Sequence, residues 1–334
     1  MWQWLHGGVA ISLLEVSLAP FFVATALDTS LPVYDRLRNL IVVAGLLLTA
    51  EVMLFWSLRR RRTEKVLQKL VTIAADVEMM STSEQATKMM STARFAMVFV
   101  QTIYTTVCME ILVYLSFPIY SGKNMGSIQV LENHPQAFWI TYFLISLCTV
   151  LGAFSSASFL SYSFQTVVCI TSLFQNLNAN ITHANTLKQL HTLTSLQQRL
   201  LDVSREFSDL CSRTHCAEVA GLVSFLVTNT AVLMIDFSNL GLIFVSSALV
   251  GFIYLLCALG QSLADATSSI GNAAYHSCWI HCEYGFRKHV MFIIHRSQAP
   301  TYLKAGMAGE LDLQKFVKAM KLWYQFLQAL LNLT

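Results

Sequence analysis

The chain has 334 residues and a net charge of +3, and 55% of its residues are hydrophobic while only 12% are charged. Soluble proteins contain about 25% charged residues, so this composition excludes an ordinary cytosolic domain. A net charge of +3 is too small to support nucleic-acid binding. The basic residues also lie in loops and do not form a continuous positive surface. The eight cysteines lie mostly in apolar stretches or basic loops, unlike the disulfide framework of a secreted domain.

Seven stretches are long and apolar enough to cross a membrane, which takes about 20 mostly apolar residues. They are roughly residues 7–26, 40–58, 95–117, 137–164, 219–235, 240–261 and 311–333. The first has no basic flank and no convincing cleavage site, so we interpret it as a retained span, with a removable signal peptide as the weaker alternative. The predicted fold class is all-α, a polytopic membrane protein with seven transmembrane helices.

Lysine and arginine are distributed unevenly among the predicted loops. Sixteen lie between spans two and three, four and five, and six and seven, whereas the alternate loops hold only Arg36, Arg38 and Lys123. Because positively charged loops stay in the cytoplasm, we expect a cytosolic amino terminus and an extracellular carboxyl terminus. A G-protein-coupled receptor would have the opposite orientation.

The fourth span has no charged residue from 137 to 187, which is much longer than a crossing requires, and a helical leucine pattern continues to residue 211. We expect these helices to extend below the membrane. Together with residues 268–297 they would form a cytosolic helical platform, where subunits could pack. Residues 118–136, which contain two glycines and two prolines, are expected to form an external lid-like loop.

The last predicted helix carries a polar stripe. Its members are Gln314, Lys318, Lys321, Gln325, Gln328 and Asn332. The steps of three and four residues place all six on one face of an α-helix. Lipid satisfies no polar group, so this stripe should face water or another protein surface. Two interpretations follow: a wet pore lined by several copies of the helix, or hydrogen bonds between helices of one subunit.

The residues from 273 to the end of the chain carry a resemblance. Ala273, Tyr275 and Trp279 are followed by Phe286-Arg287-Lys288, by Arg296-Ser297-Gln298-x-Pro300 with Ala305-Gly306, and by Leu311-x-Leu313-x-x-Phe316 before an aromatic-rich last helix. This ordered set over about sixty residues resembles the carboxyl-terminal pattern of insect odorant receptors. The related gustatory receptors end in a motif that Trp323-Tyr324-Gln325-Phe326 does not reproduce.

The resemblance implies a ligand-gated, weakly selective cation channel in the plasma membrane of a sensory neuron dendrite. It implies a small volatile organic ligand, a tetramer, and pairing with the common odorant co-receptor. The expected organisation is residues 1–264 for spans one to six with an extracellular ligand pocket, 265–310 for a cytosolic subunit anchor, and 311–334 for the pore-lining helix. The short amino-terminal segment suggests a ligand-tuning subunit or an incomplete product.

Site residues follow from the spans together with this resemblance. The polar stripe and the family's aliphatic gate indicate pore-lining positions at Lys321, Gln325, Leu327, Gln328, Leu331 and Asn332. The family's external-half pocket would bring together Glu51, Glu110, Ile111, Tyr114, Trp139, Tyr142, Phe244 and Tyr254. Subunit-anchor residues would be Tyr275, Trp279, Phe286, Arg287 and Arg296. Acids within spans are expensive and therefore functional candidates; the alternative is protonated acids hydrogen-bonded to neighbouring helices.

Other classes of protein find less support. His276, Cys278, His281 and Cys282 have a spacing that superficially suggests zinc, but no second pair lies at a finger-like distance, so no metal site is predicted. Phosphate-loop, nucleophile-elbow and metalloprotease motifs are absent from the sequence, so neither an enzyme nor a cofactor is predicted. A gustatory receptor remains the first alternative, and a G-protein-coupled receptor or a transporter the second.

Overall fold

The computed structural model describes residues 33–121, 135–184, 186–235, 240–277 and 279–332, with the single positions 16, 20, 23 and 27. Seven α-helices occupy these ranges: α2 (Val33–Glu78), α3 (Ser83–Ser121), α5 (Pro135–Thr182), α6 (Leu187–Ile235), α7 (Leu240–Tyr275), α8 (Tyr284–Ser297) and α9 (Leu313–Leu331). Most of the predicted first span and of the external loop lies outside the described residues.

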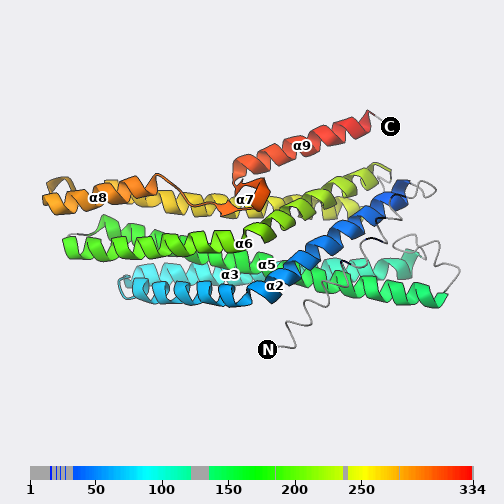
Figure 1. Cartoon of the computed structure of the whole chain (residues 1–334), viewed down its shortest axis with the longest axis horizontal. Coiled ribbons are helices and arrows are strands. Elements are labelled where there is room, and N and C mark those ends of the chain that lie inside the picture. The colour runs from blue at the N-terminus through cyan, green and yellow to red at the C-terminus, as the bar shows by residue number, and fades with distance from the viewer. Residues whose placement is uncertain are drawn as a thin grey trace.

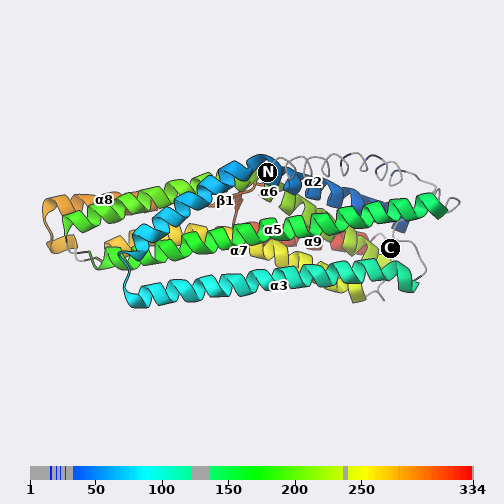
Figure 2. The same ribbon diagram turned by 90° about the horizontal axis from the view of Figure 1, so that it is seen from below.

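Five long helices form an elongated bundle (Figure 1). α6 packs against α2, α5 and α7, and α3 runs along α5 (Figure 2). The shorter α8 folds back over α7 at one end of the bundle, and α9 lies beside α6 and α7 in the other half. The helices that contain the fourth and fifth predicted spans are longer than a crossing requires, with 48 residues in α5 and 49 in α6. That their extra length lies below the membrane stays a prediction.

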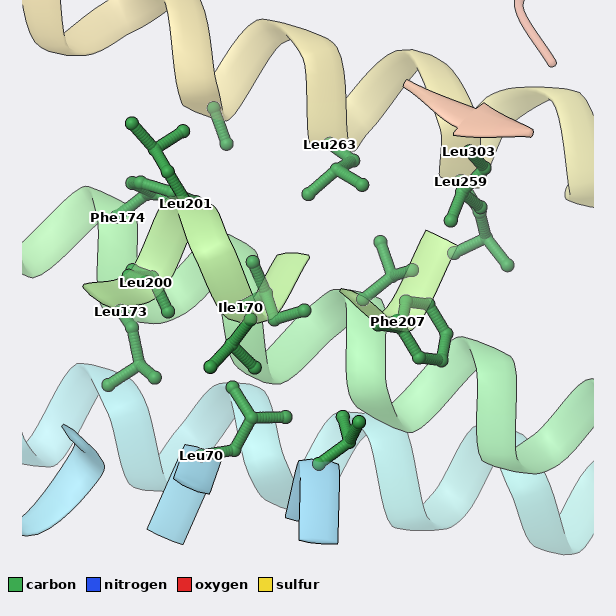
Figure 3. Packing of buried hydrophobic residues seen from close by; sticks show 14 of the residues in the cluster. Leu70, Ile170, Leu173, Phe174, Leu200, Leu201, Phe207, Leu259, Leu263 and Leu303 are labelled. Atoms are coloured by element: carbon green, nitrogen blue, oxygen red, sulfur yellow. The ribbon is translucent and has the colours of Figure 1, made fainter. Parts of the chain in front are cut away.

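The core is built from one apolar stripe on each long helix. On α2 the fully or nearly fully buried side chains include Val66, Leu70, Ile73 and Val77, at steps of four, three and four residues. Such spacing keeps a side-chain row on one face of a helix. Leu70 of α2, Ile170, Leu173 and Phe174 of α5, Leu200, Leu201 and Phe207 of α6, Leu259 and Leu263 of α7, and Leu303 converge in Figure 3.

One short segment departs from the expectation of an all-α chain. Strands β1 (Leu303–Lys304) and β2 (Glu310–Leu311) form a small antiparallel hairpin with Leu303 opposite Leu311. The turn between them needs Gly306 and Gly309, whose φ angles are 49° and 79°, a region that side chains disfavour. Leu311 therefore belongs to a strand, and α9 begins only after Asp312, whose carboxylate accepts the Lys315 backbone N–H at 2.7 Å.

Three segments of the described residues have the length and hydropathy of a membrane span: Ala153–Thr182, Leu187–Met234 and Val245–Tyr275. They overlap the predicted fourth, fifth and sixth spans. The full set of seven spans and their orientation stay predictions. The predicted boundary at residues 264 and 265 falls within α7, which continues as one helix to Tyr275.

Candidate functional site

The last helix, α9, has one docked face and one open face. Phe316, Met320 and Trp323 pack against the bundle core. Trp323 Nε1 donates to Thr230 Oγ1 of α6 at 3.0 Å, and the Phe316 ring meets Tyr254 of α7 edge-on, with centroids 5.4 Å apart. These contacts attach α9 to two helices that lie far earlier in the chain.

The open face of α9 carries the polar stripe. Gln314, Lys318, Lys321, Gln325, Gln328 and Asn332 are all exposed in the isolated chain. Exposed apolar side chains flank the stripe at Val317, Leu322 and Tyr324, and Gln328 Nε2 donates to Tyr324 Oη at 3.0 Å. A mixed apolar and polar face of this kind is suited to contact with further copies of the helix around a hydrated space.

The predicted pore-lining residues do not all share that face. Lys321, Gln325, Gln328 and Asn332 belong to it, whereas Leu327 is half-buried. Leu327 lies four residues after Trp323, so it continues the docked stripe. The side chain of Leu331 lies outside the part of the chain that the structure describes.

The hairpin at residues 303–311 joins α8 to α9 and rests on α6. Ser208 Oγ donates to the Tyr302 carbonyl and accepts the Lys304 backbone N–H, each at 2.9 Å. One turn further along α6, Ser212 Oγ accepts the Gly306 backbone N–H at 2.9 Å. Two small hydroxyl side chains therefore hold three backbone groups of the hairpin, which fixes where α9 begins.

The opposite side of the hairpin lies against α7. Thr267 Oγ1 accepts the Thr301 backbone N–H at 3.0 Å. At Gly260, a Cβ atom would lie 2.0 Å from the Leu311 carbonyl oxygen, so only glycine allows the backbones of α7 and β2 to approach this closely. The hairpin is thereby clamped between α6 and α7, and it uses the residues Ala305-Gly306 and Leu311 of the sequence pattern described above.

The predicted ligand residues are only partly described. Among them the structure describes the side chains of Glu51 and Tyr254; those of Glu110, Ile111, Tyr114, Trp139, Tyr142 and Phe244 lie outside the described side chains. Glu51 is mostly buried and forms an ion pair with Arg213 of α6 at 3.0 Å. Tyr254 contacts Phe316, in the first turn of α9. Both contacts point to the middle of the bundle, near the hairpin, and these two residues do not meet each other.

The predicted anchor residues gather at the end of the bundle that carries α8. Phe286 is buried in the core, whereas Arg287 and Arg296 are exposed. Trp279 Nε1 donates to the Tyr275 carbonyl at 3.0 Å, and Tyr275 is 63% exposed. Among the described residues no group of three metal-ligating side chains occurs, and Cys278 of the His-Cys cluster lies outside them.

The sequence did not single out a buried polar cluster between α5 and α6. His215 is fully buried, its Nε2 lies 3.1 Å from Ser163 Oγ, and the Phe159 ring lies 5.2 Å from its own. Glu218, three residues later, is 1% exposed. Buried polar residues at this spacing share one face of α6. The signal available beforehand was a charged residue and a histidine on the face of α6 that carries its leucines.

A polar cleft of ≈ 560 Å³ opens between α5 and α7 beside the start of α9. Its polar lining comes from Thr171, Gln175 and Asn178 of α5 and from Gln261, Ser262, Asp265 and Ser269 of α7. Asn178 Nδ2 donates to Ser269 Oγ at 2.7 Å and Gln261 Nε2 to Asp265 Oδ1 at 2.8 Å. The cleft offers amide, hydroxyl and carboxylate groups but no described cation.

The fold and the last helix define a class of protein: a bundle of long helices, with three described segments that could cross a membrane, and a final helix docked on its outside. The sequence model described as 7tm Odorant receptor matches residues 34–324. The chain therefore belongs to the odorant receptor family.

Sequence relatives agree with that membership. Putative odorant receptor 92a of Drosophila melanogaster is 26% identical over 219 residues, which cover 61% of this chain and 52% of that protein. Odorant receptor 67a of the same species is 36% identical over 74 residues, or 22% of this chain and 18% of that one. The match thus spans about half the length of the first of these relatives.

The insect olfactory receptor OR5 of Machilis hrabei has the same fold. Its complex with eugenol has a TM-score of 0.80 to this chain at 12% sequence identity, and the match covers 98% of this chain and 88% of that one. A second structure of OR5 gives a TM-score of 0.75. At this identity the likeness concerns the fold.

Proposed function

We propose that the protein is an odorant receptor subunit that works as a ligand-gated, weakly selective cation channel in the plasma membrane. The observation that carries the proposal is the open face of α9, with six exposed polar residues on a helix whose other face docks on the bundle. Copies of this face around an axis would line a hydrated pore. Lys318 and Lys321 then lie in a wide vestibule at the cytosolic end.

The proposed subunit arrangement is a tetramer with the odorant co-receptor. Exposed apolar side chains occur on α8 and in the segment just before it, at Ile280, Tyr284, Met291 and Phe292. They support subunit packing at this end. The loop charges support a cytosolic position for this end. The carboxyl terminus then lies outside the cell, at the far end of α9.

The proposed ligand is a small volatile organic compound, bound in the half of the bundle away from α8. One structural relative was solved with eugenol, which supports a ligand of this size. A ligand opens the pore only through its preference for the open arrangement. The hairpin couples movement of the bundle to α9, because α6 and α7 both hold the segment where α9 begins.

The test is whole-cell current in cells that express the chain with and without an insect odorant co-receptor, during application of an odorant panel. We expect ligand-evoked cation current that is independent of G proteins. Gln328→Ala, on the open face, should change ion permeation. Ser224→Ala, on α6 outside the docking contacts of α9, should leave permeation unchanged. Surface-delivered protein that gives no current in either condition would refute the proposal.

A further inference from the structure

Arg59 of α2 and the start of α9 lie at the same position along the long axis of the bundle. The Arg59 guanidinium of α2 donates to the Leu210 carbonyl of α6. Ser208 and Ser212, on either side of Leu210, hold the hairpin from which α9 starts. Arg59 and the first turn of α9 therefore lie at the same height, although they are on different sides of α6.

The outward face of α2 changes from apolar to basic at this level. Leu47 and Leu58 are 51% and 68% exposed, and the exposed residues that follow include Arg61, Arg62 and Lys65. Leu67 and Val71 are also exposed, but they lie further round the helix. Positions 58, 61, 62 and 65 lie at steps of three, one and three residues, so they cluster on one side of the helix, beside the row that contains the buried Val66. Leu58 and Arg61 are about 4.5 Å apart along the helix axis, so the change takes less than one turn.

Among the described residues these three cations have no carboxylate partner, in contrast to Arg60 and Lys69. Arg60 pairs with Glu64 at 2.8 Å and Lys69 with Glu206 of α6 at 2.5 Å. No described carboxylate lies within ion-pair distance of Arg61, Arg62 or Lys65. Three positive charges within about 6 Å of helix length are therefore left for an external anion.

The position of α2 selects the kind of anion. α2 packs on α5 and α6, whereas α9 packs on α6 and α7, and where α9 begins α2 passes on the other side of α6 (Figure 1). If α9 faces the pore, the outward face of α2 is turned to lipid. On α2 apolar side chains are followed by basic ones, and in a phospholipid the acyl chains are followed by the phosphate group. The two patterns therefore match.

We propose that Arg61, Arg62 and Lys65 bind the headgroups of anionic phospholipids in the cytosolic leaflet. The inference rests on the proposed function, which places this level at the inner membrane surface. Arginine guanidinium groups bind phosphate oxygens in pairs of parallel hydrogen bonds, and each basic residue at an anionic surface strengthens binding about fivefold. The three residues thereby fix the depth of α2 in the bilayer.

The experiment measures lipid binding to the purified complex of the full-length chain with its co-receptor. Native mass spectrometry is used to titrate short-chain phosphatidylserine, with phosphatidylcholine as the neutral probe. Arg61→Gln with Arg62→Gln should weaken phosphatidylserine binding about 25-fold, or fivefold for each charge, and leave phosphatidylcholine unchanged. Arg61→Lys with Arg62→Lys keeps the charge and should retain most of the binding.

The matched control is Lys88→Gln with Lys188→Gln, which removes two exposed positive charges from the far end of the bundle. Equal affinity of the wild type and the Arg61/Arg62 double variant would overturn the proposal, as would an equal loss in the control. The soluble headgroup glycerophosphoserine should compete poorly; competition as strong as that of the lipid would indicate a soluble-anion site instead. Absence of odorant-evoked current with lipid binding intact would count against the proposed function alone.

Discussion

At the scale of single residues, Gly260 shows how one position sets the approach of two segments. It lies on α7 where the Leu311 carbonyl of β2 passes, and a methyl group there would overlap backbone rather than a movable side chain. At Gly251, nine residues earlier on the same helix, an added methyl group would meet no atom within 4 Å. The two glycines are therefore equivalent in helix propensity but different in packing.

This difference predicts opposite effects of the same substitution. Gly260→Ala should lower the free energy of unfolding by about 1–3 kcal/mol, the usual cost of overpacking. Gly251→Ala should be neutral or stabilising by up to about 1 kcal/mol, because alanine favours helix over glycine. Thermal unfolding of the detergent-purified proteins compares them, and equal midpoints for the two variants would show that the hairpin does not need this close contact.

Trp323 is the residue that joins α9 to α6 by a side-chain hydrogen bond. Trp323→Phe keeps an aromatic ring in the docked stripe and removes only the donor to Thr230. Together with Thr230→Val it forms a double-mutant cycle, in which we expect a coupling energy of about 0.5–1.5 kcal/mol. Unfolding midpoints supply the four values. Strict additivity would mean that the bond contributes nothing to docking.

At the scale of elements, the hairpin sets where α9 begins relative to the bundle. Its attachments to α6 come from Ser208 and Ser212, and its attachment to α7 comes from Thr267. Ser208 is 1% exposed, and the two hydrogen bonds by which it satisfies hairpin backbone groups are part-buried. An unpaired buried backbone group costs about 1–3 kcal/mol.

Ser208→Ala should therefore loosen the hairpin while the helices stay folded. Hydrogen exchange of the Lys304 amide should become at least about tenfold faster, since 1.4 kcal/mol corresponds to a factor of ten. Ser204→Ala is the control, because Ser204 is also buried on α6 but its hydroxyl bonds only to the Leu200 carbonyl of its own helix. Unchanged exchange in Ser208→Ala would show that the strands hold the hairpin without the serine.

At the scale of the whole molecule, the half of the bundle that carries α8 has a well-buried apolar core among its described residues. Val77, Leu173, Leu177, Ile181 and Val290 are all fully buried there. In water, burial of each such side chain contributes about 1.5–3 kcal/mol, whereas lipid gives apolar helices no such drive to associate. This distribution agrees with a cytosolic position for that half, which we propose from the loop charges.

The proposed orientation predicts where the carboxyl terminus lies. An epitope tag added after Thr334 should be accessible to antibody on intact, unpermeabilised cells. A tag inserted between Glu78 and Ser83, in the turn that joins α2 to α3, should be accessible only after permeabilisation. The reverse pattern would assign the topology of a G-protein-coupled receptor and contradict the channel proposal.

The amino-acid sequence by itself determined the membrane class, the long helices and the family resemblance. Composition and helical periodicity are local properties, so they can be recognised without knowing which helices are neighbours. The leucine pattern from 190 to 210 predicted that α6 continues beyond a membrane span. The polar stripe of α9 was likewise visible, because its six members all lie between Gln314 and Asn332.

Only the tertiary structure decided which residues meet across the bundle. The partners of Ser208 lie 94 and 96 positions away, and Glu51 pairs with Arg213. Neither pairing has a sequence signal, because a serine or an acid on a helix can face any neighbour. Leu311 paired as a strand instead of beginning a helix, since two glycines with positive φ turned the chain back on itself. Such outcomes depend on the close approach of backbones from distant segments, which no local pattern specifies.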